Sequence, residues 1–240
     1  MSGADSSGQP WTGRTLPAGG FEGDEGGADA RLLAALTGPA DDRELMTALA
    51  AARLLVPVVA TAADTIDVDG HTVEKETDMA SVTLTGPDGT RALPAFTSIA
   101  ALAAWEPTAR PIPVTAARAA QAAVTESCDV IVLDLADAHA RELRPSMVWA
   151  LAQQREWLPA HEDPFIAASV ARALDGLPEV TGHSLGDGEP AGHGILAVTL
   201  ALVPGLPAER VRELATGVGE RLATDGELRA RVDGIAFRLA

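Results

Sequence analysis

Residues 93–105 read LPAFTSIAALAAW, and the fold is organised around this stretch. The segment that ends at Phe96 is predicted to be a strand, in which successive side chains point to opposite faces. Pro94 cannot donate to a sheet, so this strand is expected to lie at an edge or to end there. Ser98 can cap a helix through its hydroxyl, and Ile99 begins an apolar stripe at helical spacing. The stretch therefore predicts a strand that passes directly into a helix.

Strands and helices alternate on both sides of this stretch. Before it, Asp88-Gly89 supplies the turn chemistry of a hairpin. After it, Ile112 and Val114 mark a short strand, and Thr115 can cap an alanine-rich helix. The apolar run 130–133 fits a strand that is covered on both faces. This order predicts an α/β fold in which helices cover a mixed sheet.

The same stretch resembles the LPAFTS…ALxxW signature of the SseB family, the enhanced-serine-sensitivity proteins. Further segments fit that pattern: DDREL (41–45), LLVPV (54–58), RPIPV (110–114) and DVIVLD (129–134). The resemblance covers about residues 30–240. It implies an SseB-type N-terminal domain, an SseB-type C-terminal domain and no catalytic residues that can be carried over.

The chain is predicted to have three parts. Residues 1–30 are expected to be a disordered acidic tail rich in Gly and Ser, because this composition offers little to bury. Residues 31–162 are expected to form the N-terminal α/β domain. Residues 163–240 are expected to form a smaller α+β domain, which begins where Asp163 can cap a helix that has Pro164 at its first position.

Composition narrows the function classes. The net charge of −16 argues against nucleic-acid and anionic-membrane partners, which need clustered Lys and Arg. A single cysteine, Cys128, excludes an internal disulfide. No apolar run has the length of a membrane span and the N-terminus lacks the features of a signal peptide, so a cytoplasmic location is expected. One Lys among 18 basic residues suggests a GC-rich bacterial genome.

One motif points to catalysis. Residues 182–186 read GHSLG, which matches the G-x-S-x-G nucleophile elbow of serine hydrolases. That chemistry needs a sharp turn before a helix, and an acid and a His later in the chain. Here a Gly-rich loop follows, and His193 is the only later histidine. We therefore expect Ser184 to be structural and the protein not to be an enzyme.

Metal and cofactor sites are not expected. His161-Glu162-Asp163 and the set His183, Asp187 and His193 offer ligand atoms without a recognisable ligand spacing. The glycine-rich segment 188–194 lacks the Lys and the strand–helix context of a phosphate-binding loop. Neither a metal nor a cofactor is predicted.

The candidate binding site lies where the central strand meets its helix, at Phe96, Thr97, Ser98 and Trp105. The first N–H groups of a helix attract carboxylates and phosphates, and ligands gather where strands end in such sheets. The alternative is that Ser98 only caps the helix and that Phe96 and Trp105 only pack in the core.

The sequence thus predicts a non-catalytic cytoplasmic protein that binds a protein partner or a small molecule. Two alternatives remain open. One is a serine hydrolase that uses Ser184, and the other is a secretion-associated accessory protein. The resemblance adds a link to serine sensitivity, and the oligomeric state is left open.

Overall fold

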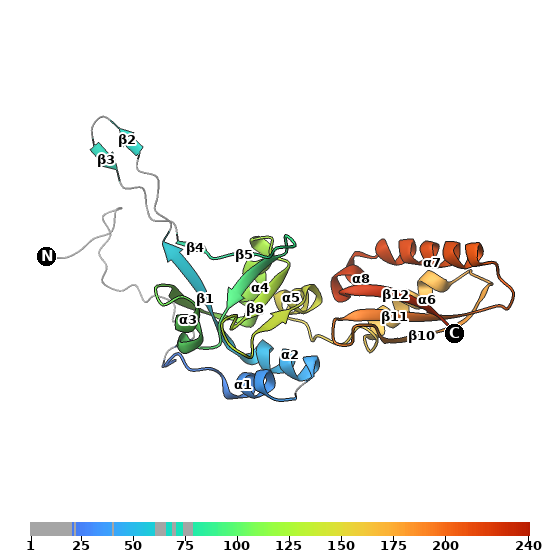
Figure 1. Ribbon diagram of the computed structural model, residues 1–240, viewed down its shortest axis with the longest axis horizontal. Helices are drawn as coiled ribbons and strands as arrows, with labels where there is room; N and C mark the ends of the chain where they lie inside the picture. Colours follow the sequence, from blue (N-terminus) through green and yellow to red (C-terminus); the bar gives the residue numbers. More distant parts are fainter. Residues whose placement is uncertain (1–20, 22, 40, 61–65, 69–70, 74–78) are drawn as a thin grey trace, which may run out of the picture.

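The computed structural model describes residues 21, 23–39, 41–60, 66–68, 71–73 and 79–240 (Figure 1). An N-terminal unit with two larger sheets lies beside a smaller unit built on a three-stranded sheet. The predicted α/β fold class is confirmed. In the described residues, no helix is long and apolar enough to cross a membrane.

The N-terminal unit alternates strands and helices, as its sequence pattern predicts. Its helices are α1 (Ala30–Thr37), α2 (Asp42–Ala51), α3 (Ile99–Trp105), α4 (Ala116–Thr125) and α5 (Pro145–Ala152). Its strands are β1 (Arg53–Ala60), β2 (Ile66–Val68), β3 (His71–Val73), β4 (Met79–Ser81), β5 (Leu84–Thr85), β6 (Arg91–Ala95), β7 (Arg110–Thr115), β8 (Val130–Leu133) and β9 (Arg141–Leu143).

These strands form a sheet of order β5-β6-β8-β9, a sheet of order β4-β1-β7 and the small antiparallel pair β2-β3. The central pair, β6 and β8, is parallel, and the chain crosses between them through α3, β7 and α4. A single antiparallel bridge between Leu55 and Phe96 joins the two larger sheets. The central stretch thus lies where the two larger sheets meet.

Of the two alternatives predicted for Pro94, the edge strand is wrong, whereas β6 does end at Ala95, the residue after Pro94. β6 lies inside its sheet, and Pro94 is opposite Val132 of β8. On the far side of β6 from β8, only the Leu55–Phe96 bridge is formed with β1. The next carbonyl of β1 on that side, that of Pro57, accepts from Val82 N at 3.4 Å, so the neighbour of β1 changes there from β6 to the segment after β4.

Local capping signals fix several helix starts. The Asp41 carboxylate accepts a hydrogen bond from Glu44 N, and the Thr115 hydroxyl accepts one from Arg118 N. Pro145 occupies the first position of α5, where its fixed φ suits the helix and its missing N–H is not needed. This helix ends at Ala152.

The C-terminal unit contains α6 (Pro164–Leu174), β10 (Val180–Asp187), β11 (Ile195–Leu202), α7 (Ala208–Ala223), α8 (Gly226–Arg231) and β12 (Gly234–Leu239). β11 is central, antiparallel to β10 and parallel to β12. Asp163 caps α6 by accepting from Phe165 N at 2.8 Å, as its sequence predicts. Helix α8 is not predicted by the sequence analysis.

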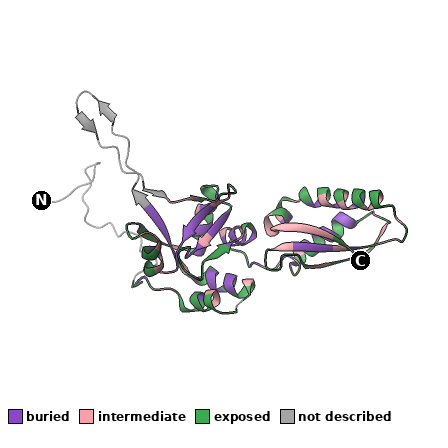
Figure 2. Cartoon of the chain, viewed as in Figure 1, coloured by how far each residue is buried: buried purple, intermediate pink, exposed green. Residues whose placement is uncertain are grey.

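Each unit has its own apolar core (Figure 2). The larger core includes Leu93 and Ile131 of the parallel strands and ends with Trp157 along the chain. The second core begins with Ala160 and centres on Leu196, Val198 and Leu200 of β11. The side chains between the two units are largely polar, and this junction contains the candidate site described below.

Residues 1–20 and 22 of the predicted disordered tail, including Trp11, lie outside the described residues. The last part of that segment contacts the N-terminal unit. Asp24 forms an ion pair with Arg53 at 2.6 Å, and Ile99 N donates to Gly26 O at 2.9 Å. Asp29 then caps α1 by accepting from Arg31 N and Leu32 N. The tail boundary predicted at residue 30 is therefore too late, because these residues make specific polar contacts.

Candidate functional site

The predicted binding residues at the end of β6 have structural partners. Phe96 is fully buried, and its ring stacks on Trp105 with the centroids 5.3 Å apart. Thr97 is also buried, and both its N–H and its Oγ1 donate to the Asp134 carboxylate, at 2.8 and 2.7 Å. Neither Phe96 nor Thr97 offers a free polar group to a ligand.

The start of α3 is also occupied. Ser98 Oγ accepts a hydrogen bond from Ala101 N at 3.0 Å, as the capping prediction requires. Gly26 O accepts from Ile99 N, so the segment before α1 covers the start of this helix. Two of the first N–H groups of this helix, those of Ile99 and Ala101, therefore already have acceptors. The contacts of Phe96, Thr97, Ser98 and Trp105 are those of packing and capping, which favours that alternative, and a binding site at these residues stays a prediction.

Ser184 lies in the middle of β10, where it is opposite Thr199 of β11. The strand continues through the whole GHSLG segment, so the sharp turn of a nucleophile elbow is absent from it. Among the described residues, Ser184 makes no side-chain hydrogen bond with a His or an acid. Nor do the described residues contain a group of three or more His, Cys, Asp or Glu that can hold a metal ion.

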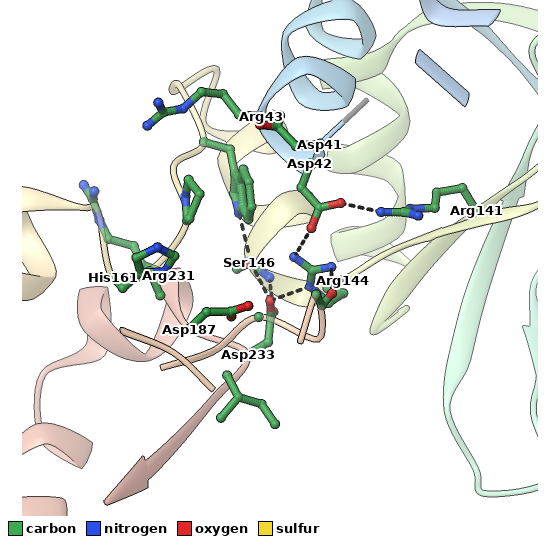
Figure 3. Close-up of a pocket in the computed structure, with 16 residues that line it drawn as sticks. Asp41, Asp42, Arg43, Arg141, Arg144, Ser146, His161, Asp187, Arg231 and Asp233 are labelled. Carbon is green, nitrogen blue, oxygen red and sulfur yellow. Dashed lines mark hydrogen bonds and ion pairs between the residues drawn. The ribbon is translucent and has the colours of Figure 1, made fainter. Parts of the chain in front are cut away.

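A cleft of about 290 Å³, lined by charged and apolar residues, lies between the two units and is the better candidate (Figure 3). The N-terminal unit contributes the start of α2, Arg141 at the start of β9, and the start of α5. The connecting segment contributes Trp157 and His161, and the C-terminal unit contributes Asp187, Gly194 and Asp233. Charged side chains of both signs therefore face one small volume.

Arg144 lies at the centre of the cleft with only 13% of its side chain exposed. Its Nη2 donates to Asp42 at 2.8 Å, its Nε to Asp233 at 2.9 Å and its Nη1 to the carbonyl oxygen of Gly192 at 2.7 Å. Burial disfavours the charged form, but the hydrogen bonds to Asp42 and Asp233 outweigh it and raise the pKa of this guanidinium. Arg144 is thus a fixed positive charge that contacts both units.

Asp233 is the matching acceptor from the C-terminal unit. Its carboxylate accepts from Ser146 N and Ser146 Oγ, each at 2.8 Å, and from Arg144 Nε. Trp157 Nε1 donates in turn to Ser146 Oγ at 3.1 Å, and the Arg144 guanidinium lies 5.7 Å from the Trp157 ring centre. Figure 3 shows Arg144, Ser146 and Asp233 pointing toward one another.

The rim of the cleft is more open. Arg141 pairs with Asp42, with 46% of its side chain exposed, and Arg43 pairs with Glu162 at 2.8 Å. Asp187 is exposed and makes no side-chain hydrogen bond or ion pair among the described residues. These rim groups are accessible to a small polar molecule in the cleft.

Sequence reasoning did not identify this site. One local signal was present, since Arg144 precedes Pro145 where a helix begins, and arginine is a poor capping residue. The N-terminus of α5 was therefore expected to receive its capping group from elsewhere in the chain. Its source, Asp233, is 89 residues away, and nothing in the local pattern indicates that pairing.

Residues 30–150 match the family description "SseB protein N-terminal domain", which covers just over half of the chain. The chain belongs to the SseB family. No curated protein and no solved structure matches it. The region matched by the SseB family includes Asp42, Arg144 and Ser146, so it supplies the N-terminal side of the cleft. The other side, with Asp187 and Asp233, lies beyond that region.

Proposed function

We propose that this SseB-family protein is a non-catalytic cytoplasmic binding protein that takes up a small polar molecule in the cleft between its two units. The observation that supports this proposal is the mixed charge of the cleft, to which both units contribute. Accessible groups of both signs, such as Arg141 and Asp187, fit a ligand that itself carries both charges. The family's link to serine sensitivity makes L-serine the first ligand to test.

Three observations favour binding over catalysis. Ser184 and its two neighbours lie in a strand, and Ser184 has no acid–base partner among the described residues. In the cleft, Arg144 and Asp233 neutralise each other through hydrogen bonds. The one cysteine, Cys128, is buried, and burial raises the pKa of its thiol, which disfavours the nucleophilic thiolate.

Isothermal titration calorimetry with L-serine, D-serine and other amino acids tests the proposal. Asp187→Ala and His161→Ala change the cleft rim and are expected to weaken binding at least tenfold. Arg212→Ala, on the exposed side of α7, is the matched control and should bind as the unmodified protein does. The proposal fails if no amino acid binds, or if the rim variants bind as well as the control.

A further inference from the structure

A single carboxylate joins the two units through three hydrogen bonds. Asp233, the residue before β12, accepts two from Ser146 and one from Arg144, all at 2.8–2.9 Å. Its side chain is only 7% exposed. Arg144 is the N-cap residue of α5 and makes no capping bond of its own. Asp233 therefore caps α5 from the other unit.

The groups that hold Asp233 are those that proteins use to bind oxyanions. They are a backbone N–H at the start of a helix, a hydroxyl and a guanidinium. Ser146 is buried, and its hydroxyl also accepts from Trp157 Nε1, which fixes its position. We call Arg144, Ser146 and Trp157 the α5 cradle. All of its donors to Asp233 lie on the N-terminal unit.

Two further contacts between the units are also polar or partly exposed. Arg155 pairs with Glu227 at 2.6 Å, with half of the arginine side chain exposed. The Arg231 guanidinium lies 5.4 Å from the ring centre of Trp149. The two apolar cores share no residue. A junction of this kind permits relative motion of the units, and ions compete with its charge pairs.

Gly194 shows how closely the junction is packed. It has a φ of +71°, and a Cβ there would collide with the Asp233 carboxylate and lie 2.8 Å from Arg144 Nε. A side chain at this position would push Asp233 out of the α5 cradle. Gly194 thus provides a second way to open the junction without altering either charged partner.

We propose that Asp233 is an internal ligand of the α5 cradle, and that a small oxyanion which displaces it releases the C-terminal unit from the N-terminal unit. This inference deepens the proposed function, since it assigns a ligand class and a conformational consequence to the same cleft. The oxyanion is a carboxylate or a phosphate, because both present the paired oxygens that Asp233 presents now. Binding and opening are then one equilibrium.

Calorimetry with inorganic phosphate tests the competition. Removing the internal ligand by Asp233→Ala should tighten phosphate binding at least tenfold. If Asp233 fills the cradle for more than about 90% of the time, less than about a tenth of the protein is free to bind phosphate, and its apparent affinity is at least tenfold weaker. Asp233→Asn keeps the shape of the side chain but removes its charge, and it should also tighten phosphate binding. Arg144→Gln in the Asp233→Ala background should abolish the gain.

Asp175→Ala is the matched control. It removes one negative charge from an exposed position of the same unit that does not line the cleft. It should change phosphate affinity less than threefold. Equal gains in phosphate affinity from Asp175→Ala and Asp233→Ala would mean that net charge alone explains the effect, and no gain from either Asp233 variant would overturn the proposal.

Small-angle X-ray scattering of the full chain tests the release. Phosphate and succinate should each increase the maximum dimension, compared with chloride at the same ionic strength, and a response to only one of them identifies the type of oxyanion. Gly194→Ala should be extended without any added anion. An unchanged maximum dimension for Gly194→Ala and for the unmodified protein in both anions would overturn the proposal.

The two proposals fail separately. If amino acids do not bind but Asp233→Ala still tightens phosphate binding, the proposed ligand is wrong and the internal ligand stands. If an amino acid binds in the cleft and the Asp233 variants leave phosphate binding and molecular dimensions unchanged, the binding function stands and the release does not.

Discussion

At the residue scale, the hydrogen bonds between Thr97 and Asp134 connect the ends of the parallel strands β6 and β8. Asp134 is buried, has a φ of +46° and accepts from both the N–H and the hydroxyl of Thr97. A non-glycine residue in this conformation is kept there by its surroundings. The sequence analysis placed Thr97 at a ligand site because its role as a donor to a distant carboxylate was not visible locally.

Thr97→Ala is expected to destabilise the protein by about 1–3 kcal/mol, because a buried carboxylate loses one of its hydrogen-bond donors. Ser98→Ala should cost about 1 kcal/mol through loss of the α3 cap. Urea unfolding at pH 7 measures both. A free energy of unfolding for Thr97→Ala within about 0.3 kcal/mol of the unmodified protein would contradict the role of Thr97.

A second residue, Asp225, makes the C-terminal unit sensitive to acid. The N–H of Leu228 and the hydroxyl of Ser169 donate to its carboxylate and lower the pKa of this group below its ordinary value of 3.8. Because the pKa is lower in the folded state, the ionised carboxylate stabilises the fold at pH values above the ordinary pKa. This stability is lost as the pH falls through the folded-state pKa.

Asp225→Asn should therefore reduce the loss of stability of the C-terminal unit below about pH 4. Asparagine can still cap α8, but it does not titrate. Thermal unfolding followed from pH 7 to pH 2 measures the effect. The matched control is Asp175→Asn, which changes an exposed residue in the same unit. Identical acid profiles for Asp225→Asn and the unmodified protein would contradict this assignment.

At the scale of elements, β10 decides how the GHSLG segment is interpreted. Val180–Asp187 pairs with β11 from end to end, with one irregularity between Val180 and Gly182. A serine hydrolase needs its Ser on a tight turn between a strand and a helix. In this protein the chain leaves β10 into the 188–194 segment and returns as another strand, β11. The motif is therefore a chance match in a strand.

Ser184→Ala is expected to fold normally, to leave ligand binding unchanged and to shift the midpoint of thermal unfolding little, because the side chain is exposed. The unmodified protein should not react with a fluorophosphonate probe, since only an activated serine reacts readily. Mass spectrometry of the treated protein provides the measurement. A covalent adduct on Ser184 would restore the hydrolase hypothesis.

At the scale of the whole molecule, the units have separate apolar cores and meet at a junction with many polar contacts, which indicates that they unfold independently. Leu133 and Leu200 are almost fully buried, one in each core. Replacing either with Ala should cost about 2–5 kcal/mol, because it removes apolar contacts and leaves a cavity. Since the cores share no residue, each cost should fall on one unit.

Hydrogen exchange provides the measurement. Leu200→Ala should reduce protection of amides in β11 and α7, with little change in β6 and β8, and Leu133→Ala should do the reverse. Loss of protection throughout the molecule in either variant would show that the two units unfold as one.

The sequence by itself determined the alternation of strands and helices and several helix starts, although α8 was not predicted. Caps such as Asp41, Thr115 and Asp163 act within three residues of their own position, and the apolar run of β8 needs no distant partner to be recognised. These signals are local because they depend on backbone groups within one turn and on side-chain periodicity. The alternation of strands and helices likewise gave the fold class.

Only the tertiary structure decided which distant residues meet. Pro94 lies in an inner strand because β5 and β8 pair on either side of β6, and Thr97 is buried because Asp134 returns to it. Arg144 and Asp233 form the core of the cleft although each looks like a surface charge in its own segment. Such pairs arise from how the units pack against each other, and no short-range preference of the chain encodes that packing.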